Sequence, residues 1–268
     1  MKIDKTLYKE LFSIGVLLFL IYLAVWVRSS TINSPTVLDY DPWWFYRRAE
    51  MILNNSFRSP KWDILSFYPP GRPFGTHEGW AYTIAFFYSI WKNIDNAVTL
   101  TKVAIFSPLI IISLISLPTF FLGRILTKNN FGGILIFLFS TLTPTLISVS
   151  MAGYCDTDAP VVFYSFLSVL SVFLLLRRES ILTYIFAFLC NFLFIFNWSQ
   201  GWITLELLSV FLPGFFIFRI IEEIIRERRI VFDLRKIFNE LKPMLRPALI
   251  LLIGINFITF PITKDTLF

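Results

Sequence analysis

The sequence predicts an all-α polytopic membrane protein with about seven transmembrane helices. Its composition, the spacing of its apolar runs and the distribution of its basic residues all point to this class. The chain has 268 residues, of which 56% are hydrophobic and 16% charged, and its mean hydropathy is +0.69. Soluble domains are about 25% charged, and a single core could not bury this much apolar surface. The composition therefore excludes soluble enzymes, disordered chains and disulfide scaffolds.

Apolar runs of spanning length recur along the chain. A membrane-spanning helix needs roughly 17–25 apolar residues. Seven runs meet or approach this length, at about 11–27, 103–122, 131–150, 159–176, 181–198, 201–218 and 248–263. An eighth run, Trp80 to Trp91, is too short to span, and we interpret it as interfacial or as the lead-in to the second span. The first run is longer than a usual signal-peptide core and lacks an Ala-x-Ala exit, which favours a membrane anchor.

The basic residues orient these spans. With seven spans and a cytoplasmic amino terminus, 15 of the 24 Lys and Arg residues fall in inside segments, and every short inside loop is basic, as the positive-inside bias requires. Counting 80–91 as a span would move Arg177 and Arg178 outside. We therefore prefer seven spans and predict a multi-pass protein of the cell membrane. The same distribution accounts for the net charge of +6 without a nucleic-acid partner.

This topology gives each loop a side of the membrane. The outer face carries a long first external loop, about 28–102, and a short second acidic loop, 151–158. The inner face carries the mixed-charge stretch 219–246, where we expect an amphipathic helix on the membrane surface. Cys155 lies in a loop and Cys190 in an apolar run, so we expect buried thiols and no disulfide.

The first external loop contains the motif Asp39-Tyr40-Asp41-Pro42-Trp43-Trp44-Phe45-Tyr46-Arg47-Arg48. One interpretation is structural: Asp41 caps a helix that begins at Pro42, and the aromatic residues form an interfacial belt. The other is chemical: two acids and two arginines hold a divalent metal and a phosphate. Either way we expect a helix over 42–53 lying flat on the outer membrane surface, with Arg47 and Arg48 near the lipid headgroups.

The second acidic motif is Gly153-Tyr154-Cys155-Asp156-Thr157-Asp158-Ala159-Pro160. Capping of the following span explains one acid, Asp158, but leaves Asp156 unexplained. Two carboxylates in a short loop between lipid-facing helices are costly unless a cation pairs with them. Only the seven-span topology puts both motifs on the same side of the membrane. We therefore expect Asp41, Asp156 and Asp158 to converge on one hard cation, Mn²⁺ or Mg²⁺, which could clamp a phosphate leaving group.

Two further ionisable residues are weaker candidates for substrate contacts. His77, the only histidine, is followed by Glu78 and could be a ligand or a substrate contact, although a single histidine in an exposed loop is more often neither. Glu206 lies about one turn inside the sixth predicted span, and an ionisable residue there is a functional hypothesis by default.

These motifs, taken in order, resemble those of oligosaccharyltransferase catalytic subunits, especially the archaeal ones. The acidic pair running into Pro-Trp-Trp-Phe-Tyr-Arg-Arg is similar to the start of that family's first external loop. Later segments resemble further parts of the family: Phe67-Tyr68-Pro69-Pro70-Gly71, then His77-Glu78-Gly79 with the Trp80–Ile90 run, and Gly153-Tyr154-Cys155-Asp156-Thr157-Asp158. The turn from Trp198 to Trp202 fits a Trp-Gly-Trp-like turn before the sixth span. The resemblance covers most of the chain and implies a membrane glycosyltransferase C-type fold.

The resemblance implies roles for individual residues. Asp41 would be the catalytic residue, a metal ligand that also contacts the acceptor amide, and Asp156 and Asp158 would be the ligands of the second motif. Asp39 matches the first acid of the first motif, and Arg47 or Arg48 could contact the donor diphosphate. The implied reaction moves a glycan from a lipid-linked donor, a polyprenyl (dolichyl) phosphate or diphosphate, to the asparagine of Asn-x-Ser/Thr in a polypeptide, with inversion at the sugar.

The chain also departs from the family pattern. Family members have about thirteen spans and a soluble carboxy-terminal domain with a Trp-Trp-Asp motif, which 1–268 lacks, as it lacks the late external loop with a metal-binding glutamate. We therefore expect an amino-terminal transmembrane catalytic module that needs a further segment or a partner chain for turnover.

Two alternatives stay open at this point. One is a related membrane glycosyltransferase that uses a lipid-phosphate sugar, although such enzymes usually lack an Asp-x-Asp loop after the third span. The other is a transporter or a non-catalytic scaffold subunit. A transporter would place its acids inside helices at mid-membrane, whereas these acids lie in loops at helix ends.

Overall fold

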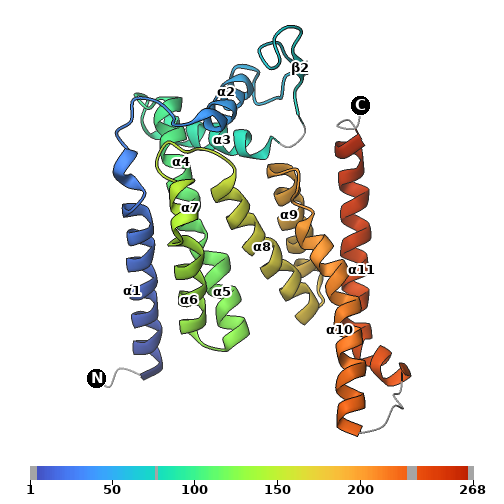
Figure 1. Ribbon diagram of the computed structural model, residues 1–268. Coiled ribbons are helices and arrows are strands. Elements are labelled where there is room, and N and C mark those ends of the chain that lie inside the picture. Colours follow the sequence, from blue (N-terminus) through green and yellow to red (C-terminus); the bar gives the residue numbers. More distant parts are fainter. Residues whose placement is uncertain (1–4, 76–77, 228–233, 265–268) are drawn as a thin grey trace. The chain divides into compact units, whose positions relative to one another are not determined.

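The computed structural model in Figure 1 describes residues 5–75, 78–227 and 234–264. Helices dominate it, as the sequence predicts. The chain forms two compact units, each described here by itself. The first comprises Met1–Leu167 with Phe196–Trp198, and the second comprises Ser168–Ile195 with Ser199–Phe268.

Upright helices form the body of the first unit (Figure 1). They are α1 (Lys5–Trp26), α4 (Leu100–Leu114), α5 (Ser116–Thr127), α6 (Asn130–Thr141), the short α7 (Pro144–Ser148) and the start of α8 (Asp158–Arg177). The apolar run from 100 to 127 is divided into α4 and α5 at Ile115. Pro118 explains the break, because a proline ring clashes with the carbonyl four residues earlier, here that of Leu114.

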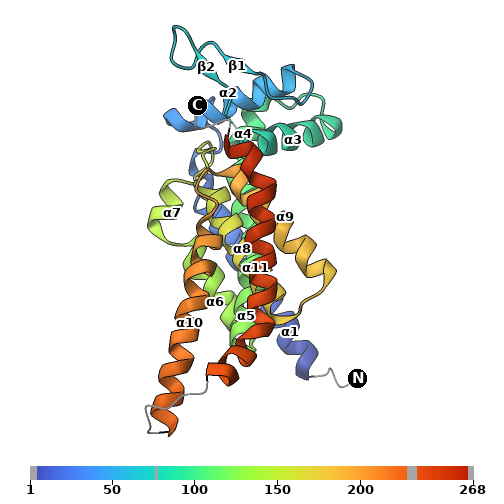
Figure 2. The same ribbon diagram turned by 90° about the vertical axis from the view of Figure 1, so that its right-hand side faces the viewer.

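Two further helices lie across one end of these upright helices, as Figures 1 and 2 both show. They are α2 (Tyr40–Asn54) and α3 (Gly79–Ile94). Helix α3 turns a face with Trp80, Ala81 and Ile84 into the core of the unit. The transverse course of α3 agrees with the interpretation that Trp80 to Trp91 does not span the membrane, which stays a prediction.

The connections around α2 are short and irregular. A 3₁₀ turn, η1 (Ser29–Thr31), follows α1, and the segment between α2 and α3 contains β1 (Trp62–Asp63) and β2 (Arg72–Pro73). These two strands are antiparallel, with Trp62 opposite Pro73 and Asp63 opposite Arg72. The strands and their connecting loop lie on the side of α2 away from the upright helices (Figures 1 and 2).

Glycines allow α5 and α6 to pack at close range. A Cβ on Gly133 would run into the carbonyl oxygen of Phe120, and one on Gly123 would meet the backbone of Gly132 and Gly133. Lys128 makes the turn between the helices with a left-handed φ of 56°, and Asn129 caps α6 by accepting from the amide of Phe131. Small residues that bring backbones together are typical of helix interfaces in membranes.

The second unit contains the end of α8, most of α9 (Ile181–Asn197), α10 (Ile203–Glu227) and α11 (Leu234–Lys264). Inside this unit the Ser168 hydroxyl donates to the side-chain oxygen of Asn191 at 2.6 Å, with both residues fully buried. The described residues of the stretch 219–246 belong to the ends of α10 and α11. The expected position of this stretch on the membrane surface stays a prediction.

Among the described residues, four helical segments are long and apolar enough to cross a membrane: Leu7–Trp26, Leu100–Thr127, Asp158–Arg177 and Ile203–Arg226. Two apolar helices are shorter, Asn130–Thr141 and Ile181–Asn197. The expected run 131–150 is divided between α6 and α7 at Thr143-Pro144. The chain is thus a multi-pass membrane protein, while the count of seven spans stays a prediction.

We predict that Gly133→Val lowers the thermal stability of the purified protein in detergent by several degrees. The added branches must push α5 and α6 apart, and such overpacking typically costs about 1–3 kcal/mol. Gly15→Val is the matched control, because a Cβ at Gly15 in α1 has no neighbour within 4 Å. Equal melting temperatures for the two variants would contradict the close packing of α5 and α6.

Candidate functional site

The first acidic pair lies at the start of α2. Asp39 is the N-cap, with φ 67° and a carboxylate that accepts from the amide of Tyr40 at 2.7 Å. The expectation that Asp41 caps the helix is therefore wrong: α2 begins two residues before Pro42, which sits in the first turn, where its missing N–H costs no helical hydrogen bond. Among the described residues the exposed Asp41 carboxylate has no hydrogen-bond or ion-pair partner, so it is available for a ligand.

The second acidic pair lies just before α8. Asp156 is half-buried, and its Oδ1 accepts from the amide of Thr157 at 2.5 Å and faces the Thr157 hydroxyl at 3.2 Å. Asp158 is the first residue of α8 and is exposed. Gly153 starts this segment with a φ of 94°, which an L side chain rarely adopts.

Three hydrogen bonds connect this segment to α2 and α3. The amide of Leu38, just before Asp39, donates to the carbonyl of Gly153 at 3.0 Å. The Trp80 indole donates to the carbonyl of Cys155 at 2.7 Å. The Cys155 thiol lies 3.5 Å from the carbonyl of Pro42, and burial raises the pKa of this thiol to about 12. Both acidic pairs are therefore fixed to one buried framework whose thiol carries no charge.

The electrostatics show that the two acidic pairs share one environment. Burial raises the pKa of Asp156, and the nearby negative charges of Asp41 and Asp39 raise it further, against the hydrogen bond from the Thr157 amide. The charges of the two loops thus repel each other across the site. A cation among them would relieve this repulsion.

The donor set suits a hard divalent cation, because carboxylate oxygens arrive from two segments that the fold brings together. Within the described ranges, however, no three His, Cys, Asp or Glu side chains are already grouped as metal ligands. The metal site formed by Asp41, Asp156 and Asp158 therefore stays a prediction, one that requires their carboxylates to close in on the ion.

Arg47 faces the loop that follows α2. Its guanidinium forms an ion pair with Asp63 and donates to the hydroxyl of Ser66 at 3.0 Å. Burial opposes ionisation of Asp63, but the hydrogen bonds from Ser66 and Arg47, together with the charge of Arg47, lower its pKa. Arg47 therefore holds the loop against α2 through a carboxylate that stays ionised.

Arg48 is enclosed rather than exposed. Only 1% of it is accessible, and its guanidinium forms an ion pair with Glu78. It lies 3.9 Å from the ring centroid of Trp44 and 4.2 Å from that of Phe74. Burial lowers the pKa of Arg48 to about 10, with help from the positive charges of Arg72 and Arg47. The expectation that Arg48 lies near the lipid headgroups is wrong, because its pairing with Glu78 requires it to face the interior of the loop.

Two weaker candidates from the sequence remain. His77 is outside the described residues. Glu206 is in the first turn of α10, where it is exposed, and it belongs to the second unit. Sequence analysis missed the framework roles of Trp80, Cys155 and Asp63. The resemblance to the family included the segments that contain Trp80 and Cys155 but gave neither residue a role, and no signal in the sequence pointed to Asp63.

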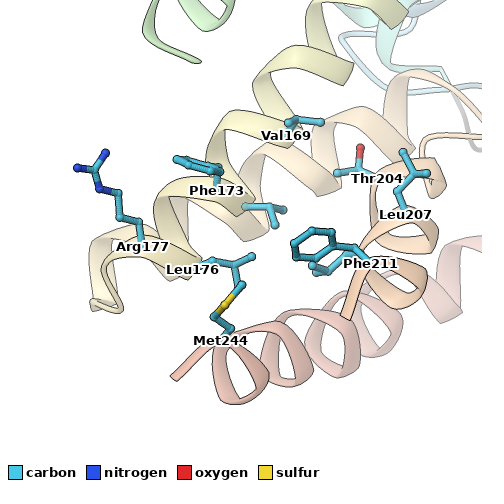
Figure 3. Close-up of a pocket in the computed structure, with 10 residues that line it drawn as sticks. Val169, Phe173, Leu176, Arg177, Thr204, Leu207, Phe211 and Met244 are labelled. Atoms are coloured by element: carbon cyan, nitrogen blue, oxygen red, sulfur yellow. The ribbon is translucent and has the colours of Figure 1, made fainter. Parts of the chain in front are cut away.

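An open apolar pocket of about 440 Å³ in the second unit is lined by residues of α8, α10 and α11. Figure 3 shows the apolar side chains around it, with Thr204 and Arg177 as the polar residues of its lining. This lining contains no carboxylate. The pocket therefore offers apolar contact and none of the chemistry of the acidic loops.

Comparison with known proteins settles the family. Residues 14–262 match the family model described as Oligosaccharyl transferase STT3, N-terminal. The chain belongs to this family. The matched range includes both acidic pairs, so they lie in the part of the chain that the family model describes.

Two curated relatives are archaeal proteins named dolichyl-phosphooligosaccharide-protein glycotransferase. The one from Methanocaldococcus jannaschii is 29% identical over 133 residues, which cover 45% of this chain and 14% of the relative. The one from Methanococcus voltae is 24% identical over 195 residues, which cover 67% of this chain and 21% of the relative. The matches thus span about a fifth or less of each relative.

Solved structures share the fold. The apo oligosaccharyltransferase of Archaeoglobus fulgidus superposes with a TM-score of 0.67 at 18% identity, over 76% of this chain and 26% of that one. The same values hold for a structure of AglB from Archaeoglobus fulgidus in complex with an inhibitory peptide and a dolichol-phosphate. This likeness shows that the chain has the membrane-domain fold of these proteins.

We predict that Arg48→Met loosens the first external loop. Removing one partner of a buried ion pair typically costs about 3–5 kcal/mol, here because Glu78 would be left buried and unpaired. Limited proteolysis should cleave the 55–75 segment much faster than in the unmodified protein. Arg58→Met is the control, because Arg58 is exposed and its side chain has no partner among the described residues. Equal cleavage of both variants would contradict the role of Arg48.

Proposed function

We propose that this chain is the amino-terminal membrane module of an oligosaccharyltransferase. The enzyme would transfer a glycan from a polyprenyl (dolichyl) phosphate or diphosphate carrier to the asparagine of an Asn-x-Ser/Thr acceptor, with inversion at the sugar. The observation that supports this most is the joining of the two acidic segments by hydrogen bonds in a chain of this family.

Asp41, Asp156 and Asp158 are the proposed ligands of one Mn²⁺ or Mg²⁺ ion. Such an ion, when bound, stabilises the negative charge that develops on the departing phosphate. The oxygen-only donor set and the repulsion between the loops support this assignment. Asp39 has a different task, because its carboxylate already caps α2 and thereby fixes the first turn of the helix, in which Asp41 lies.

Asp41 also suits contact with the acceptor. An amide nitrogen is a poor nucleophile because its lone pair takes part in peptide-type resonance. An exposed carboxylate that accepts the side-chain N–H of asparagine would weaken this conjugation. The Asp41 carboxylate is exposed at the start of α2 and is not used for capping, so it can accept such a bond.

The placement of the acids favours an enzyme over a transporter. The four aspartates lie at helix starts or in a loop, on segments joined to one another, whereas a transported ion would be bound by residues of discontinuous helices at mid-membrane. A related lipid-phosphate-dependent glycosyltransferase stays the second candidate. The family match across residues 14–262, which includes the Asp156-x-Asp158 loop, supports the first.

The proposed partners follow from the same assignment. They are a lipid-linked glycan donor, an acceptor polypeptide, membrane lipid and the carboxy-terminal segments that the longer relatives contain. We place the amino terminus in the cytoplasm and the acidic loops on the outer face, as the positive-inside bias indicates.

We predict that Asp41→Asn in the full-length protein lowers the rate of glycan transfer by about 10²–10³, the usual effect of removing one electrostatic element of a transition-state site. Transfer would be measured with a lipid-linked donor and an Asn-x-Thr peptide. Glu50→Gln is the control, because it replaces another exposed acid on α2 by its amide. Near-normal transfer by Asp41→Asn would overturn the assignment of Asp41.

We predict that Asp156→Asn raises the manganese concentration needed for half-maximal transfer and that excess manganese partly restores the rate, because one charged ligand is lost while others remain. A manganese titration of both the variant and the unmodified enzyme measures this. A loss of rate that no manganese concentration changes would mean that Asp156 does not bind the ion.

We predict opposite accessibilities at the two ends of the spans. A membrane-impermeant maleimide added to intact cells should label Glu50→Cys and leave Arg178→Cys unlabelled until the membrane is opened. Both native residues are exposed, so burial does not confuse the result. Labelling of Arg178→Cys alone would reverse the proposed topology.

A further inference from the structure

Arg28 is a buried charge that the proposed reaction does not use. It lies just beyond α1 and is 0% exposed. Its three guanidinium nitrogens donate to three acceptors: Nε to the Ser150 hydroxyl at 2.7 Å, Nη1 to the carbonyl of Ala24 at 2.8 Å and Nη2 to the carbonyl of Thr141 at 2.5 Å. In the part of the chain that the structure describes, no carboxylate forms an ion pair with it.

A buried guanidinium without a counter-ion is expensive. Burial lowers the pKa of Arg28 to about 10, so the arginine is still cationic at neutral pH. An apolar side chain would fill this space at lower cost in solvation. Only the planar guanidinium group of arginine can donate hydrogen bonds in three directions at once. Here these bonds join the end of α1, the end of α6 and the turn at Ser150.

The backbone beside Arg28 extends the same connection. The carbonyl of Arg28 accepts from the amide of Ala152 at 2.9 Å, and the hydroxyl of Thr31 donates to the carbonyl of Ala152 at 2.7 Å. The amide of Gly153 donates to the carbonyl of Ile105 at 3.0 Å. Residues 150–153, which we call the root of the acidic loop, are thus fixed both to the chain segment that follows α1 and to α4.

The root leads directly to both acidic pairs. Three residues after Gly153 the chain reaches Asp156, and the carbonyl of Gly153 accepts from the amide of Leu38, the residue before Asp39. Any shift of the root therefore moves Asp156 relative to Asp41. Ser150 is the link between side chain and root, because its hydroxyl accepts from Arg28 and donates back to the carbonyl of Leu146.

We propose that Arg28 is a positioning residue of the acidic site: through Ser150 and the root it sets the separation of Asp156 and Asp158 from Asp41. The part of this proposal that concerns metal binding rests on the proposed function. The structural part, that Arg28 fixes the root, rests on the hydrogen bonds alone. Arg28 does not touch substrate or ion. It acts by holding the loop that carries two of the ligands.

The structural part is tested by hydrogen exchange with mass spectrometry on the full-length protein in detergent. Arg28→Met should make amides in the 150–154 segment exchange at least about tenfold faster, while amides of α5 and α6 keep their protection. Ser150→Ala should have the same local effect with less risk to folding. Ser148→Ala is the matched control, because this exposed serine bonds only within its own turn, to the carbonyl of Thr145.

The second measurement is manganese binding, followed by electron paramagnetic resonance of free Mn²⁺. Groups that orient metal ligands from behind typically change affinity by about 10–100-fold. Ser150→Ala and Arg28→Met should therefore weaken binding at least about tenfold, and Arg28→Lys should recover only part of it, since an ammonium cannot match the three-way fork. The KM for the acceptor peptide should stay unchanged.

The outcomes separate the hypotheses. Faster exchange at 150–154 with weaker manganese binding supports the proposal. Equal hydrogen exchange and equal manganese binding in Ser150→Ala and Ser148→Ala would overturn it. Loosening of α5 and α6 by Ser150→Ala would also overturn it, because the contact would then contribute to general stability. Local loosening without saturable manganese binding in the unmodified protein would confirm that Arg28 holds the root and would refute the proposed metal site.

Discussion

The acidic site depends on holding like-charged segments together. Asp41 and Asp156 repel each other, so attraction between them cannot bring the loops into contact. Neutral hydrogen bonds do so instead, from Leu38 to Gly153 and from Trp80 to Cys155. Because these bonds join uncharged groups, they require no cation to form. Helix α3 and the residue before the N-cap of α2 supply the donors of these bonds.

A second set of contacts holds the segment between α2 and α3 against α2. Arg47 engages Asp63, and Arg48 lies between the rings of Trp44 and Phe74 while it pairs with Glu78. These arginines follow directly after the first acidic pair, and in the sequence they suggested a phosphate site. Because both arginines are engaged inside the loop, the carboxylates are the charged groups that remain available to bind a ligand. This agrees with a cation as the ligand that binds the site first.

Several features followed from the sequence because they depend on local physics. Composition and run length predicted a multi-pass helical protein, and amphipathicity predicted a helix near 42–53 that does not span. Other features required the tertiary structure. Helix boundaries are one example: the run 131–150 is divided at Thr143-Pro144, and α10 continues to Glu227. Such boundaries depend on competing local preferences of similar energy.

The sequence by itself determined which residues could carry the chemistry: four aspartates in two short motifs, which resemble the acidic motifs of one family. Tertiary structure alone decided which of them are available. It assigned capping to Asp39 rather than Asp41, and it enclosed Arg48. It also placed the buried Arg28 behind the loop that carries Asp156. The placement of Arg28 depends on its contact with Ser150, and the acidic framework on the contact of Pro42 with Cys155. Both pairs are more than a hundred positions apart in the sequence, and no local pattern encodes such pairs.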